Sequence, residues 1–149
     1  MAPNCSIAVL NGPNLNMLGM REPEIYGHRT LSDIEAECRK LAYEKQLEID
    51  WYQSNVEGDL ITKIQLLAES VDWIVINAAG LTHTSVALRD ALSLFPGNII
   101  EVHLSNIHAR ETFRQTSLIS EIAKGVIAGF GTTSYYLAID AIAHLHLET

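Results

Sequence analysis

The sequence predicts an α/β fold, because short apolar runs alternate with amphipathic helical segments five times along its 149 residues. Continuous apolar runs are typical of strands in a parallel sheet that helices cover on both faces. Five strand–helix units favour a flavodoxin-like three-layer sandwich, with a five-stranded parallel sheet of order 2-1-3-4-5. We expect a single domain over residues 1–149, since neither a linker nor an internal repeat divides the chain.

The expected strands are apolar runs bounded by turn-forming residues. The first ends at Gly12-Pro13, and the third consists almost entirely of apolar residues. The five runs are SIAVLN (6–11), EIDWYQS (48–54), WIVIN (73–77), NIIEVHLS (98–105) and GVIAGFG (125–131).

Helices are expected where apolar residues recur at helical spacing. Thr30 or Ser32 can cap the first expected helix. Its apolar stripe consists of Leu31, Ile34, Cys38 and Leu41. The remaining helices are expected over 58–70, 84–95, a short segment near 109–114, and 132–146. Thr132 or Thr133 can cap the last one.

Composition narrows the function classes. Apolar residues make up 48% of the chain and charged residues 19%, which is typical of a soluble globular protein. The net charge is −8 and Lys and Arg do not cluster, so nucleic acid is not an expected partner. Cys5 and Cys38 lack zinc-ligand spacing. Without a signal peptide or an apolar membrane-spanning stretch, we expect a cytoplasmic protein that does not bind membranes.

Polar side chains follow the ends of most expected strands, in NGPNLNMLGMREPEIYG, NAAGLTHTS and HLSNIHARETFR. The carboxyl ends of parallel strands meet at one edge of the sheet, so these groups should converge on one crevice. Each has a structural alternative: Asn14 could form an Asx-turn, Asn77 could cap the next segment, and His83 and His103 could be ordinary structural histidines. Glu101 lies within an apolar strand and therefore needs a partner, which a nearby His or Arg could supply.

Common catalytic motifs are missing. The sequence has no dinucleotide-binding G-x-G-x-x-G after the first strand, no P-loop and no G-x-S-x-G elbow. No Lys follows a strand end, which disfavours imine chemistry. Tyr, Arg, His and Asn can carry out proton transfers, and Arg21 lies five residues before Tyr26. A nearby guanidinium favours a phenolate base, while a His suits a general acid near neutral pH.

Five segments together resemble the type II 3-dehydroquinate dehydratases: residues 11–27, 53–61, 76–92, 101–114 and 125–138. The resemblance covers nearly the whole chain in order. It implies conversion of 3-dehydroquinate to 3-dehydroshikimate and water, without a cofactor or metal. It also implies a homo-oligomer, a dodecamer built as a tetramer of trimers.

The same resemblance implies roles for individual residues. Tyr26 would be the base, activated by Arg21, and Arg110 would support Tyr26. His103 would be the acid, oriented by Glu101, and Asn14 would hold a water that stabilises the enolate. The substrate would be bound by Asn77, His83, Leu104, Ser105 and Arg114, and by Asp90 of a neighbouring subunit. Residues 19–27 would form a mobile lid, with Gly19 and Gly27 as its hinges.

Two other functions use the same fold. An FMN-binding module would need a hydroxyl-rich phosphate loop after the first strand, where this chain has Asn, Pro and Arg. A non-catalytic relative would be expected to lose the acid or the base, whereas Tyr26 and His103 are both present. The sequence therefore favours the enzyme.

Overall fold

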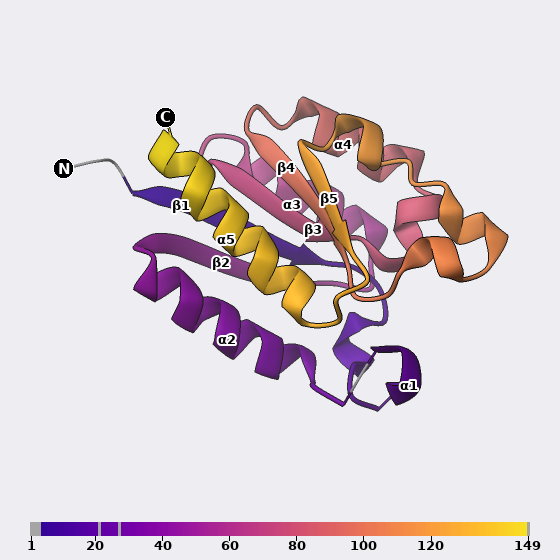
Figure 1. Ribbon diagram of the computed structural model, residues 1–149. Helices are drawn as coiled ribbons and strands as arrows, with labels where there is room; N and C mark the ends of the chain where they lie inside the picture. Colours follow the sequence, from indigo (N-terminus) through magenta and orange to yellow (C-terminus); the bar gives the residue numbers. More distant parts are fainter. Residues whose placement is uncertain (1–3, 21, 27, 149) are drawn as a thin grey trace.

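The structure is a computed structural model that describes residues 4–20, 22–26 and 28–148, with only the backbone described at Ile25 and Tyr26. Five parallel strands form one sheet in the order β2-β1-β3-β4-β5 (Figure 1), which confirms the predicted topology. The strands are β1 (Cys5–Asn11), β2 (Leu47–Gln53), β3 (Trp73–Asn77), β4 (Asn98–His103) and β5 (Gly125–Ala128).

Helices cover both faces of this sheet and produce three layers. One face carries α2 (Leu31–Glu44) and α5 (Thr133–Glu148), and the other carries α3 (Glu57–Leu67) and α4 (Val86–Leu94) (Figure 1). Successive residues of a strand point to opposite faces. In β1, Ile7 and Val9 therefore pack in the α2/α5 core, and Leu10 packs in the α3/α4 core.

Local sequence signals explain where the helices begin. Thr30 caps α2: its hydroxyl accepts a hydrogen bond from the Asp33 amide, and the Asp33 carboxylate accepts one from the Thr30 amide. The Ser85 hydroxyl caps α4 by accepting from the Leu88 amide. Trp73 is buried at the start of β3, and Cys5 is buried at the start of β1.

The segment near 109–114 and the fifth strand differ from the sequence-based expectation. The helix expected over 109–114 is replaced by two 3-10 turns, η3 (Ile107–Ala109) and η4 (Thr112–Gln115), because the backbone at Arg110 is extended (φ −111°, ψ −159°). The fifth strand ends at Ala128 rather than at residue 131, since Gly129 takes a φ of 97° and turns the chain away. Within the expected lid, Pro23–Tyr26 forms a short helix, α1.

Candidate active site

A pocket opens at the carboxyl edge of the sheet, beyond the ends of β1, β3 and β4. Apolar residues such as Leu15 and Ile107 form part of its wall. Eight residues predicted from the sequence line it together: Asn14, Asn77, His83, His103, Leu104, Ser105, Arg110 and Arg114. The predicted convergence of strand-end residues is therefore confirmed for this set.

Four predicted site residues do not appear among the lining residues. Glu101 lies behind His103 and contacts it from within β4. Asp90 is exposed on α4. Arg21 and the side chain of Tyr26 lie outside the described part of the chain. The roles assigned to these two residues, and the lid of which they are part, stay predictions.

Close approach of two loops builds the wall near Asn14. The Gly12 amide donates to the Asn77 carbonyl over 2.8 Å, and a Cβ at Gly12 would lie 2.5 Å from the Ala78 oxygen. Only glycine fits there without displacing the backbone. Asn14 follows with a left-handed φ of 71°, and its amide donates to the Asn55 side chain over 2.9 Å. Its own side chain makes no capping hydrogen bond to the 3-10 turn Leu15–Met17.

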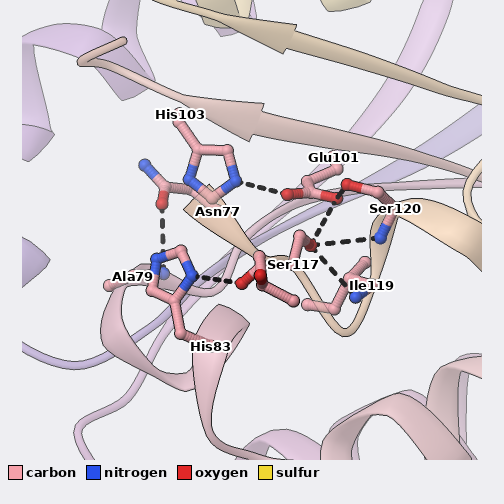
Figure 2. A network of polar contacts seen from close by, with 9 residues as sticks. Asn77, Ala79, His83, Glu101, His103, Ser117, Ile119 and Ser120 are labelled. Carbon is pink, nitrogen blue, oxygen red and sulfur yellow. Dashed lines mark hydrogen bonds and ion pairs between the residues drawn. The ribbon is translucent and has the colours of Figure 1, made fainter. Parts of the chain in front are cut away.

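Glu101 and His103 form a buried pair. Their side chains are 0% and 6% exposed, and His103 Nε2 lies 2.5 Å from Glu101 Oε2 (Figure 2). The partner that Glu101 needed is therefore a neighbouring His, one of the two residue types expected. Burial acts to raise the pKa of Glu101, but hydrogen bonds from His103 and from two serine hydroxyls outweigh it and hold that pKa below its usual value.

Those two serines were not predicted from the sequence. The hydroxyls of Ser117 and Ser120 donate to Glu101 Oε1 over 3.0 and 2.6 Å (Figure 2). They lie 16 and 19 residues beyond Glu101, so no local spacing links them to it. The available signal was the carboxylate itself, because a buried charge requires donors from some part of the fold.

His83 faces His103 from the turn that follows β3. The two rings stack with centroids 6.4 Å apart and planes within 20° of each other. His83 Nδ1 lies 2.8 Å from the Thr116 carbonyl oxygen (Figure 2). A carbonyl only accepts, so Nδ1 carries the proton, and Nε2 is the acceptor in the neutral ring.

Asn77 is held from two sides. Its Oδ1 accepts from the Ala79 amide over 3.2 Å (Figure 2), an Asx-type turn that precedes the 3-10 turn Ala79–His83, whose N-cap residue is Ala78 and has no side-chain cap. Its amide nitrogen donates to the Tyr135 hydroxyl over 3.0 Å, and that hydroxyl donates to Asn11 Oδ1 over 2.7 Å. Burial raises the pKa of the Tyr135 phenol, which therefore stays neutral and serves as a structural bridge. Sequence reasoning did not identify this bridge.

Two arginines line one side of the pocket, and the Glu111 carboxylate pairs with both. Arg110 Nη1 donates to the Ser105 hydroxyl over 3.3 Å. Arg114 Nε donates to Glu111 Oε1 over 3.0 Å, which lowers the pKa of Glu111. Although they do not share a helix, both side chains reach the pocket and are less than one-fifth exposed. Partly desolvated guanidinium groups suit an anionic ligand such as a carboxylate.

Two further findings concern residues 4–20, 22–26 and 28–148. No three His, Cys, Asp or Glu side chains there are grouped as metal ligands would be. In the same part of the chain, no helix combines the length and apolar character needed to cross a membrane.

The whole chain is similar to known proteins. Residues 5–143 match the family model described as dehydroquinase class II. A 3-dehydroquinate dehydratase of Brucella canis is 52% identical over 143 residues, which cover 96% of this chain and 91% of that protein.

Solved structures give the same result. A type II dehydroquinase from Propionibacterium acnes has a TM-score of 0.91 and 40% identity, covering 95% of this chain and 99% of that one. A type II dehydroquinase from Butyrivibrio crossotus has a TM-score of 0.91 and 42% identity, covering 93% and 97%.

Proposed function

The chain belongs to the class II dehydroquinase family, and on that premise we propose that it is a hydro-lyase that converts 3-dehydroquinate to 3-dehydroshikimate and water. The observation that carries the proposal is the pocket, where two histidines, two asparagines and two arginines converge beyond the strand ends. Such a set can bind an anionic, hydroxyl-rich molecule and move protons on it.

The reaction requires two proton transfers. A base removes the proton next to the ketone and leaves an enolate. The enolate electrons then form the carbon–carbon double bond while the β-hydroxyl leaves as water, taking a proton from an acid. We assign the base to Tyr26 and its activation to Arg21, with Arg110 as a supporting residue.

His103 is assigned as the acid. Its Nε2 is engaged by Glu101, so Nδ1 is the ring nitrogen through which it would reach a ligand in the pocket. An anionic Glu101 would stabilise the imidazolium and hold the ring in place, as a third group does in catalytic triads. This geometry supports the acid role.

The remaining groups would bind and orient the substrate. The carboxylate would lie near Leu104 and Ser105, where the Arg110 guanidinium adds positive charge. Arg114, His83 and the second N–H of the Asn77 amide would hold ring hydroxyls. Asn14 would position a water at the enolate oxygen.

The direct test is to add 3-dehydroquinate to the purified, metal-free protein and follow the enone absorbance of the product. Tyr26→Phe removes the ionisable hydroxyl, so turnover should fall by at least about 10²-fold. Thermal unfolding and far-ultraviolet circular dichroism should stay close to wild type. Near-normal turnover in this variant would exclude Tyr26 as the base.

The acid role can be tested separately. His103→Ala should slow the loss of water more than exchange of the proton next to the ketone with solvent deuterium, because proton removal does not use the acid. Equal losses in both measurements would argue against the assignment of His103.

The assembly is also part of the proposal. Asp90 is exposed on α4 and does not line this chain's pocket. This position is compatible with a role in a neighbouring subunit's site within a dodecamer of four trimers. Analytical ultracentrifugation should detect the dodecamer, and a monomer at working concentration would contradict both the assembly and the role of Asp90.

A further inference from the structure

We propose that Ser117 and Ser120 are positioning residues: their hydroxyls hold Glu101 as an oriented carboxylate, which in turn holds His103 for proton delivery. The inference rests on the proposed function for its catalytic consequence. Its structural basis is the buried network of Figure 2, which links the segment before β5 to the pocket through β4.

The direction of the Ser117 hydrogen bond is fixed by its surroundings. Its hydroxyl oxygen accepts from the amides of Ile119 and Ser120 over 3.0 and 3.1 Å. A hydroxyl has two acceptor positions and one proton. Because both acceptor positions are used, the proton points at Glu101 Oε1, 3.0 Å away.

Glu101 consequently meets three donors. Oε1 accepts from Ser117 and Ser120, the latter over the short distance of 2.6 Å, and Oε2 accepts from His103. An ionised carboxylate can accept all three, whereas a protonated carboxyl would have to reverse one of these bonds. The two hydroxyls therefore favour the anion despite its complete burial.

The effect on His103 follows from this anion. Because Glu101 Oε2 accepts from His103 Nε2, the proton stays on Nε2. Nδ1 is then the His103 nitrogen that can hydrogen-bond to a ligand. Neither serine lines the pocket, so each acts through Glu101 and has no direct role in substrate binding.

Ser120→Ala is the sharpest test, because it removes the shorter hydroxyl contact and leaves the Ser117 bonds to the backbone in place. Ser6→Ala is the matched control. It also deletes a serine hydroxyl that faces a carboxylate, that of Asp72 over 3.3 Å, but at the opposite end of the sheet. Near-ultraviolet circular dichroism verifies that each variant keeps its packing.

Ser120→Ala should lower kcat about tenfold, the loss of roughly one charge-assisted hydrogen bond. KM should change less than about twofold, since binding groups are untouched. Water loss should slow more than exchange of the proton next to the ketone. Ser117→Ala should show the same pattern, and Ser6→Ala should resemble wild type. A parallel fall in exchange and water loss would indicate a merely structural effect and overturn the inference.

A measurement without substrate separates this inference from the proposed function. Carbon-13 NMR of the Glu101 carboxyl measures its pKa. The groups that hydrogen-bond to this carboxyl are His103 on β4, Ser117 and Ser120. The His83 ring, from the turn after β3, stacks on His103. The pKa of Glu101 should rise in Ser120→Ala and stay unchanged in Ser6→Ala. An unchanged pKa in Ser120→Ala overturns the inference, whereas absence of turnover in the wild type overturns only the proposed function.

Discussion

Two serine–carboxylate contacts lie at opposite edges of the same sheet. At the amino edge, Asp72 Oδ2 accepts from the amide and the hydroxyl of Ser6 over 2.9 and 3.3 Å, and Asp72 is exposed. At the carboxyl edge, Glu101 is fully buried and accepts from two serines and a histidine. A carboxylate that accepts from serine thus makes a solvated contact in one place and belongs to a buried network beside the pocket in the other. Burial makes the difference, because each donor matters more where water cannot replace it.

The two edges also differ in their hollows. The hollow at the amino edge is the larger, about 760 Å³ against about 130 Å³, and its lining mixes acidic and basic groups such as Glu69, Asp72 and Lys124. The smaller one collects histidine, asparagine and arginine. Size therefore does not identify the site in this molecule. The candidate site is chosen by the chemistry of its lining and by its place at the carboxyl ends of the strands.

The largest expected difference is in kcat, between a variant that neutralises Glu101 and one that neutralises Asp72. Glu101→Gln places an amide among three donors, so at least one hydrogen bond is lost and no charge supports His103. We expect kcat to fall about 10²-fold, measured by enone formation. Asp72→Asn should leave kcat within about twofold of wild type, since its carboxylate is exposed and distant from the pocket. Similar losses in both variants would show that the two edges do not differ as described.

Two adjacent tyrosines extend the comparison to stability. The buried Tyr135 hydroxyl bridges Asn11 and Asn77, whereas the Tyr136 hydroxyl accepts from Arg29 over 3.2 Å at an exposed contact. Tyr135→Phe should lower the free energy of unfolding by about 1–3 kcal/mol, because two buried amides lose a partner. Tyr136→Phe should cost less than about 0.5 kcal/mol. Urea unfolding measures both, and equal values would contradict the role of the bridge.

The smallest expected effect is a change in the unfolding free energy at low pH. The folded pKa of Glu101 is lowered from its ordinary value of 4.5, so its ionised form contributes stability at pH values above 4.5. That contribution is lost as the pH falls through the lower folded pKa. The difference in unfolding free energy between wild type and Glu101→Gln should therefore be constant near neutrality and narrow below about pH 4. A gap that widens in acid would mean that Glu101 is protonated in the folded protein.

Much of this architecture was predictable from local patterns. Apolar runs located the five strands, and their alternation with helices gave the observed sheet order. The segments after the strands contained eight residues that line the pocket. Glu101 was recognisable as a charge in need of a partner, because a carboxylate in an apolar strand is costly unless donors surround it. These features depend on residues close together in the chain.

Tertiary structure alone decided the remaining partners. Ser117 and Ser120 reach Glu101 from beyond β4, and Tyr135 reaches Asn11 across 124 residues. The expected helix over 109–114 likewise gave way to two short turns, which still bring Arg110 and Arg114 to the pocket. Such pairings depend on where the crossovers place distant segments, and hydrophobic periodicity carries no information about which hydroxyl will meet which carboxylate. By itself, the sequence determined the three layers and the edge of the sheet at which the candidate site lies. Three-dimensional packing determined that Ser117 and Ser120 donate to the Glu101 carboxylate.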